Sequence, residues 1–440
     1  MNARFLIALW AAGILAQTPP QPVPSAGVIT LAEALARARQ YAGQAQAAGI
    51  AVGQAAEDRA QARAARLPSA SAFNQFIYTQ GNTTPSGVFV ANDGVHVYNE
   101  QLVVHQEFLS IIRSGEVRRA LALEAVARAR GDIAARGLNA TVIQDYYAIP
   151  AAERKLVYTN TSLAEASEFL DITRKQEQGG EAAHADVVKA QVLVRQRERD
   201  VSEAQLAVDK AKIALGVLIF PDLSTSYEVV DDLDQTAIVP PLEETRAKAS
   251  ATSPDIKAAQ FNVESSGHDV NVARYGYLPS LGLDFFYGID ANTFTAHTLI
   301  HEPDGFLFNR NNLGYVAQAT LNIPIWNWGT TRSKVKQAEL RREQAQLDLT
   351  LAQRTLAGNV AGQSREAQTA QTQIASLRDS EQLSIENLRL TTLRYRAGEA
   401  TAFEVVDAQA TLTAARNAYI DGLSRFKIAF ATLQNLSGSF

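Results

Sequence analysis

The chain has 440 residues and a mass of 47.6 kDa, and its 41 basic against 46 acidic residues leave a net charge of −5. This balance disfavours nucleic-acid binding, which needs a basic surface, and the absence of cysteine excludes disulfides, thiolate metal sites and cysteine nucleophiles. Hydrophobic residues make up 46% of the chain, but after the N-terminus no run of about 18 apolar residues occurs. A membrane crossing would therefore have to use strands.

The N-terminus is predicted to be a signal peptide over residues 1–16. A basic residue precedes an apolar core at 5–15, and Ala16 offers a small residue for cleavage. The apolar stretch of about 12 residues is too short to span a bilayer. A buried N-terminal helix is the alternative. Prolines at 19, 20, 22 and 24 cannot continue a helix, so we expect a flexible lead over 17–30.

Residues 31–218 are predicted to hold an alanine-rich helix, two strands, a very long helix, a glycine turn and a returning helix. At 1.5 Å per residue the long helix would reach about 100 Å, and Pro150 should kink or break it. The predicted segments are a helix over 31–66, strands near 72–80 and 95–108, a helix over 112–178 and a turn at Gly180.

A connector over 219–242 leads into 243–440, where the same order of elements is expected. Apolar residues alternate with small or polar ones in both of its strands, as in Leu281, Leu283 and Phe285. A period of two over about ten residues is typical of a strand with lipid on one side and water on the other. The predicted segments are a helix over 242–275, strands at 280–290 and 313–326, a helix over 329–396 and a turn at Gly398.

The two halves resemble each other in sequence as well as in order. The run that begins at Gly180-Glu181-Ala182 resembles a run 218 residues later that begins at Gly398-Glu399-Ala400, and Leu-Pro-Ser precedes both strand pairs. An internal two-fold repeat is therefore expected. Each long helix is rich in Ala, Gln, Arg, Glu and Leu, which are strong helix formers, and its thin apolar stripe favours lateral association with other helices.

Four strands in one sheet leave two unpaired edges, which neither water nor lipid tolerates well. A soluble sheet half-buried against helices is the alternative, but we expect the sheet to close with copies of itself. Phe108, Trp326 and Trp328 lie where an interfacial aromatic girdle would be placed. The predicted fold class is thus an α+β membrane protein.

In this order of elements the chain resembles the TolC-like outer-membrane efflux protein family over nearly its whole length after the signal. Leu393-Arg394-Tyr395-Arg396-Ala397-Gly398-Glu399 begins the most specific stretch. The resemblance implies a homotrimer with a 12-stranded β-barrel, four strands from each chain, in the outer membrane. It also implies an α-helical barrel through the periplasm, and a belt formed by the connector and the chain end. A periplasmic adaptor protein and an inner-membrane transporter would deliver the solutes.

The resemblance also implies roles for residues at the two turns. Gly180 and Glu181, with Gly398 and Glu399, would form the periplasmic tips that contact the adaptor. Family positions place an acidic ring at the entrance, and here the matching residues are Asp186, Glu404 and Asp407. A solvated acidic helix face is the alternative to that ring.

Three further positions bear on the closed state of the entrance. Tyr395 stands at a position that relatives use for closure contacts. Lys189 matches Asp407 in the first half and could partly neutralise Asp186, three residues away. Ala400 replaces a basic residue that ties the entrance shut in some relatives.

No catalytic or cofactor pattern stands out in the sequence. His297 and His301 are four apart but are predicted to lie in a solvated loop between strands, and no nucleophile elbow or phosphate-binding loop is found. The sequence therefore predicts a protein that is not an enzyme and has no cofactor. Two functions remain: a passive outer-membrane conduit for efflux or type I secretion, and a periplasmic or surface coiled-coil scaffold without a pore.

Overall fold

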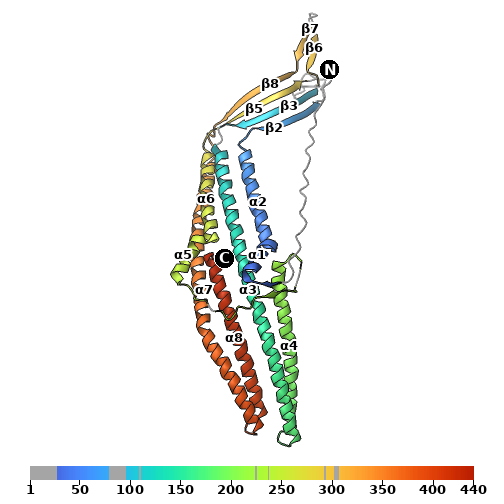
Figure 1. Cartoon of the computed structure of the whole chain (residues 1–440). Coiled ribbons are helices and arrows are strands. Elements are labelled where there is room, and N and C mark those ends of the chain that lie inside the picture. The colour runs from blue at the N-terminus through green and yellow to red at the C-terminus, as the bar shows by residue number, and fades with distance from the viewer. Residues whose placement is uncertain are drawn as a thin grey trace.

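The computed structural model describes residues 27–78, 96–108, 111–222, 225–235, 237–291, 294–301 and 307–440. The chain is elongated, with a tilted β-sheet at one end and long helices that run away from it (Figure 1). The predicted signal peptide at 1–16 and the first part of the predicted lead lie outside the described residues.

The sheet is antiparallel, and its four strands are ordered β2-β3-β5-β8. The last strand ends four residues before its predicted limit of 326, because Pro324 lacks the N–H that a paired strand would donate. The strands are β2 (Ser69–Tyr78), β3 (His96–Glu107), β5 (Ser280–Ala291) and β8 (Leu313–Asn322).

A second hairpin extends the connection between β5 and β8. It consists of β6 (His297–His301) and β7 (Leu307–Asn311), so the prediction of a loop at His297 and His301 is wrong. Both histidines belong to one short strand. Among the described residues, no group of three or more His, Asp or Glu side chains could hold a metal ion.

The helix expected before each strand pair is divided into two. The break between α5 and α6 falls at Ser253, because a residue before proline is kept out of the helical region, and the Ser253 hydroxyl accepts the Ile256 N–H. In the first half the break falls at Ala42, which has extended backbone. The helices are α1 (Leu31–Tyr41), α2 (Gly43–Ala64), α5 (Leu242–Thr252) and α6 (Pro254–Tyr275).

Four longer helices complete the chain: α3 (Ile111–Gln178), α4 (His184–Ile219), α7 (Thr330–Arg396) and α8 (Ala402–Ser437). α3 passes through Pro150 without interruption, so the predicted break is absent. Pro150 is buried next to Ile149, where tertiary packing offsets the lost backbone hydrogen bond. Across the described residues, no helix is both long and apolar enough to span a membrane.

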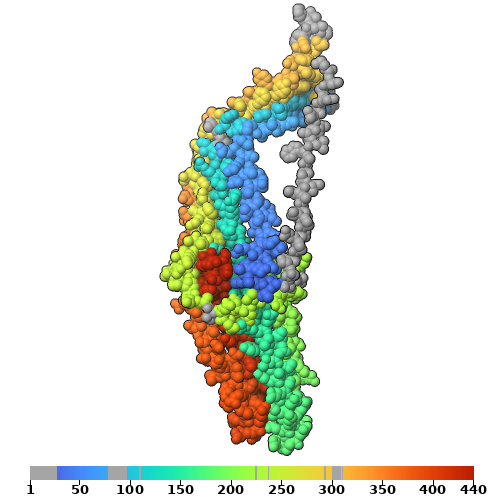
Figure 2. All heavy atoms as spheres, viewed as in Figure 1, coloured from blue at the N-terminus to red at the C-terminus, as the bar shows by residue number. Residues whose placement is uncertain are grey.

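The helices form two layers, one beyond the other. Next to the sheet the neighbours are α2, α3, α6 and α7, in that order, and in the far layer they are α4, α3, α8 and α7. α3 and α7 run through both layers. Figure 2 shows the far layer as two adjacent columns, α3 with α4 and α7 with α8.

The largest core lies at the waist between these layers. Its centre includes Tyr146, Ile149, Leu215 and Ile420. A short parallel pair packs there, β1 (Val28–Ile29) with β4 (Glu228–Val229), and the Tyr146 hydroxyl donates to the Ile29 carbonyl at 3.0 Å. The prediction of a flexible lead over 17–30 is therefore wrong at its end, since Ile29 is buried.

Candidate functional site

The sheet has two chemically different faces, most clearly on β5 and β8. One face carries only apolar side chains from these strands, while the other carries Asp284, Asp290, Gln318 and Thr320 among glycines and apolar residues. Many of the apolar side chains are exposed. The apolar face is made by Leu281, Leu283, Phe285, Tyr287 and Ile289 with their partners Leu321, Ala319, Ala317, Tyr315 and Leu313.

β2 and β3 are less regular than β5 and β8. Asn74 and Glu100 face each other, and Gln106 lies opposite Leu283, on the side that is apolar in β5 and β8. On the polar side, His105 Nδ1 lies 2.6 Å from Asp284 Oδ1, and these two residues are register partners on β3 and β5. β2 and β8 are the outer strands, and each has one strand neighbour within the described chain. The sheet therefore presents an apolar face, a polar face and two open edges.

Exposed aromatic residues mark the junction between the sheet and the helices. Phe108 is 64% exposed, Trp326 75% and Trp328 89%. The two tryptophan rings contact each other edge to face, with centroids 5.7 Å apart. The role of these residues at a membrane interface stays a prediction.

The two predicted turns have the same geometry at the far end of the molecule. Gly180 and Gly398 have φ of +79° and +78°, a conformation that glycine adopts without strain. In each turn the N–H after the glycine donates back five residues, Glu181 to Gln176 and Glu399 to Arg394. These are Schellman turns, which end α3 and α7 and start the return helices.

Glu404 forms a capping box at the start of α8, which the sequence prediction missed. Its carboxylate accepts from the Thr401 backbone, and the Thr401 hydroxyl accepts from the Glu404 N–H at 3.3 Å. The hydrogen bonds that the Thr401 N–H and hydroxyl donate to this carboxylate, with Arg394 Nη1 at 3.6 Å, hold the pKa of Glu404 below its usual value. The spacing Thr-x-x-Glu before an apolar helix was the available signal.

The other two predicted ring acids lie on different helices. Asp407 is exposed one turn further along α8. Asp186 lies in the first turn of α4, where Lys189 Nζ approaches its carboxylate to 3.5 Å, as the sequence suggested. All three acids are near the tips of the two hairpins, and an acidic ring around an axis stays a prediction.

Tyr395 is buried between the two hairpins rather than free at the tip. It is 5% exposed, its ring packs on Phe169 with centroids 5.2 Å apart, and its hydroxyl lies 3.3 Å from Thr173 Oγ1. Burial raises the pKa of Tyr395. The Gln176 amide also donates to the Tyr395 carbonyl at 3.1 Å. These contacts join the end of α7 to α3.

A groove of about 310 Å³ lies between α3, α7 and α8. Its floor includes Phe169 and Leu412. Ion pairs cross it from α3, with Glu168 Oε1 2.8 Å from Arg396 Nη2 and Glu165 Oε1 3.3 Å from Arg416 Nη2. These pairs could not be predicted from the sequence, because their partners are more than 220 residues apart.

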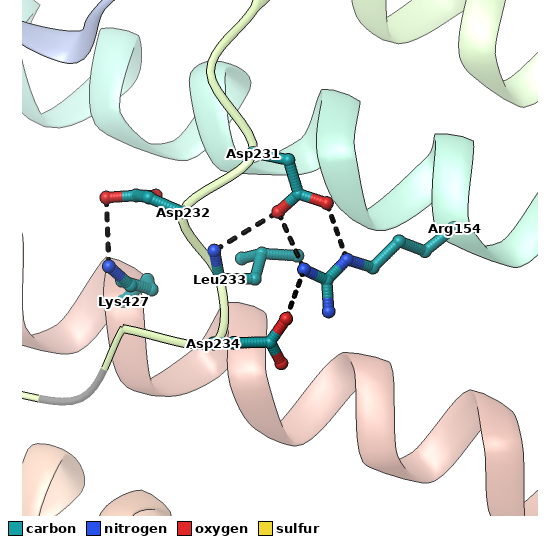
Figure 3. Close-up of polar contacts among 6 residues, drawn as sticks. All are labelled: Arg154, Asp231, Asp232, Leu233, Asp234 and Lys427. Carbon is teal, nitrogen blue, oxygen red and sulfur yellow. Dashed lines mark hydrogen bonds and ion pairs between the residues drawn. The ribbon is translucent and has the colours of Figure 1, made fainter.

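The connector is fixed to the waist by ion pairs in which Asp231 and Asp234 are exposed and Lys427 is buried (Figure 3). From α3, Arg154 donates to both Asp231 and Asp234, each at 2.6 Å, and this guanidinium lowers the pKa of Asp234. From α8, Lys427 Nζ lies 2.9 Å from Asp232 Oδ2. Three acidic residues within four positions thus tie one loop to two helices.

The fold and these surfaces define a class of protein in which long helical hairpins carry a sheet with one apolar face, one polar face and two open edges. The model of the outer membrane efflux protein family matches residues 246–439. TtgC of Pseudomonas putida, a probable efflux pump outer membrane protein, is 26% identical over 69% of this chain and 61% of its own length. The outer membrane protein TolC of Vibrio cholerae is 26% identical over 68% of each chain.

The solved structure of the outer-membrane channel OprN is similar in fold, with a TM-score of 0.79 over 93% of this chain and 90% of its own, at 17% identity. The family model, the named relatives and this structural neighbour agree. Together they support a TolC-like outer membrane factor, located in the outer membrane and extending into the periplasm. The expectation of that family, made from the sequence, is confirmed.

Proposed function

We propose that the protein is the passive outer-membrane conduit of a tripartite efflux pump or a type I secretion system. Three copies would pool their sheets into one 12-stranded barrel, and their helices would form a tunnel through the periplasm. A periplasmic adaptor and an inner-membrane transporter would deliver the cargo. The comparisons above support the export role, because TtgC and the family model that matches this chain are both described as efflux proteins.

The sheet is the observation that carries this proposal. Its apolar face suits lipid, its polar face suits a water-filled lumen, and its edges β2 and β8 each need a partner. A second and a third copy supply those partners, β8 of one chain pairing with β2 of the next. The similar element order of the two chain halves, expected to be an internal repeat, fits a tunnel wall built from equivalent hairpins.

The tips are proposed to form the periplasmic entrance. Gly180, Glu181, Gly398 and Glu399 would contact the adaptor, and Tyr395 would hold the entrance closed through its contacts with α3. Three copies of Asp186, Glu404 and Asp407 would give rings of carboxylate that favour cations.

Planar-bilayer conductance of the purified full chain tests the conduit. We expect discrete cation-selective channels from a folded trimer. A folded protein that inserts no channels would favour the alternative, a periplasmic or surface coiled-coil scaffold without a pore.

A further inference from the structure

The segment that links β8 to α7 exposes an unusual amount of apolar surface. Ile325 is 91% exposed, and Trp326 and Trp328 project beside it. Trp328 also has a φ of +53°, in the left-handed region that bulky side chains rarely adopt. Such strain is retained where the surrounding structure, or a function, requires the side chain to point in that direction.

Directly after this segment, α7 begins with unpaired cations. Arg332, Lys334 and Lys336 are exposed, and within the described chain none of them forms an ion pair with an acid. No acidic residue occurs in the first turn of α7. Cations at the start of a helix are unfavourable, because the helix dipole already places partial positive charge there. The positive charge of these three residues is therefore not neutralised by an ion pair within the described part of the chain.

The corresponding region of the first half is mostly neutralised. Arg113 lies 3.0 Å from Glu107 and 3.1 Å from Glu116, and Arg119 lies 2.6 Å from Asp269. The two halves thus place cations at the same level of the molecule. Among the described residues the first half leaves Arg118 without an ion pair, whereas the second half leaves three cations, and the nearest acid along α7, Glu339, pairs with Arg274. This contrast points to an external anion at the start of α7.

We propose that the exposed aromatics and the three cations, with Arg332 and Lys336 on one side of α7 and Lys334 on the other, form a surface that binds the phosphate of anionic glycerophospholipids in the periplasmic leaflet. We call this surface, Ile325, Trp326, Trp328, Arg332, Lys334 and Lys336, the junction patch. The inference rests on the proposed function, because it needs the sheet to lie in the bilayer.

The dimensions of the junction patch fit a headgroup layer. Arg332 and Lys336 lie about 6 Å apart along the helix axis, and the polar layer on each side of a bilayer is also about 6 Å thick. Tryptophan favours the boundary between hydrocarbon and headgroup, and Lys and Arg next to it attract anionic lipid. The apolar residues would enter the hydrocarbon edge, and the cations would meet phosphate just outside it.

Tryptophan fluorescence offers a direct test. The chain has three tryptophans, so in a Trp10→Phe background the emission comes from Trp326 and Trp328 alone. The full chain would be reconstituted in phosphatidylcholine vesicles with a fixed minor fraction of phosphatidylglycerol. Two vesicle sets would have the same composition and differ only in which lipid carries bromine, at equal mole fraction, as a quencher.

We expect brominated phosphatidylglycerol to quench about two-fold more than brominated phosphatidylcholine, and high salt to reduce this ratio. The triple variant Arg332→Gln, Lys334→Gln, Lys336→Gln should bring the ratio to about one. A matched control, Arg199→Gln, Lys210→Gln, Arg354→Gln, removes the same charge far from the sheet and should keep the original ratio.

Equal quenching by both lipids in the starting protein, or a ratio unchanged in the triple variant, would overturn the proposal. So would the absence of quenching in a protein that forms conducting channels, since the aromatics would then be covered by a neighbouring copy. Absence of both quenching and conductance would instead count against the conduit itself.

Discussion

The Glu404 carboxylate accepts hydrogen bonds from both the backbone N–H and the hydroxyl of Thr401, each at 3.1 Å. One side chain therefore serves two purposes: it caps α8, and it is proposed to contribute charge to the tunnel entrance. Because these hydrogen bonds lower the pKa of Glu404, its stabilising effect on the helix start is present at neutral pH. It is lost as the pH falls through the lowered pKa.

The double substitution Glu404→Gln with Asp407→Asn tests the acidic ring. Glutamine can still cap the helix, so the charge is removed while the capping box is retained. We expect a lower cation preference and weaker block by multivalent cations in planar bilayers. Glu404→Ala, which removes cap and charge together, separates the two effects by also lowering helix stability. Unchanged selectivity in the double variant would place these acids away from the entrance.

Lys189→Gln should have the opposite effect on selectivity. Lys189 lies 3.5 Å from Asp186 and offsets its charge. Removing the ammonium leaves Asp186 unpaired, so cation preference should rise and multivalent cations should block at lower concentration. The pair is exposed, and the free energy of unfolding should change by less than about 1 kcal/mol. Lys210→Gln, on the same helix but far from the tip, is the charge-matched control.

The hydrogen bond between Tyr395 and Thr173 is expected to help keep the entrance closed. Tyr395→Phe and Thr173→Val each remove it while keeping most of the packing on Phe169, and each should cost about 1 kcal/mol. Both variants should raise the open probability of single channels. Thr173→Val also removes the hydrogen bond that the Thr173 hydroxyl donates to the Phe169 carbonyl at 2.8 Å, so the double variant should resemble Thr173→Val alone. If the two changes in open probability add up in the double variant, the hydrogen bond between Tyr395 and Thr173 does not control the closed state.

The connector should loosen when Lys427 is replaced. Lys427→Met leaves the Asp232 carboxylate without its cation, and Asp232 Oδ1 already has no hydrogen-bond partner. We expect a loss of roughly 2 kcal/mol, less than for a fully buried pair because Asp232 keeps 27% of its side chain exposed. Faster proteolysis within 219–242 and a lower melting temperature would report it. Lys155→Met removes the exposed pair with Asp421 and should change stability little.

Gly288 and Gly314 are register partners that should respond differently to alanine. A Cβ at Gly288 would lie 2.0 Å from the Glu100 carbonyl oxygen, whereas a Cβ at Gly314 would meet nothing within 4 Å. Gly288→Ala should therefore force β3 and β5 apart and reduce the yield of heat-stable oligomer in detergent gels. Gly314→Ala should assemble normally. Equal yields from both variants would mean that the sheet adjusts freely at this position.

The elements with a strong periodic or compositional signal were predictable from the sequence. The alternation of Leu281, Leu283 and Phe285 identified β5, and a continuous run of helix formers identified α3 and α7 within a residue or two. The β6–β7 hairpin was missed because its residues are mostly polar. Lys427 and Asp232 are 195 residues apart and meet only because the folded chain brings α8 and the connector together. Local sequence patterns do not predict such a contact.

α3 has 68 residues and α7 has 67, and both extend from the sheet to a glycine turn. Because hydrogen-bonded helices neither stretch nor shorten appreciably, these two struts set the depth to which the molecule reaches below the membrane. An insertion in one of these helices alone would move its glycine turn past the other turn, so the end of the molecule far from the sheet would no longer be level. The protein can therefore adapt to a wider or narrower cell envelope only if both helices change in length by the same amount.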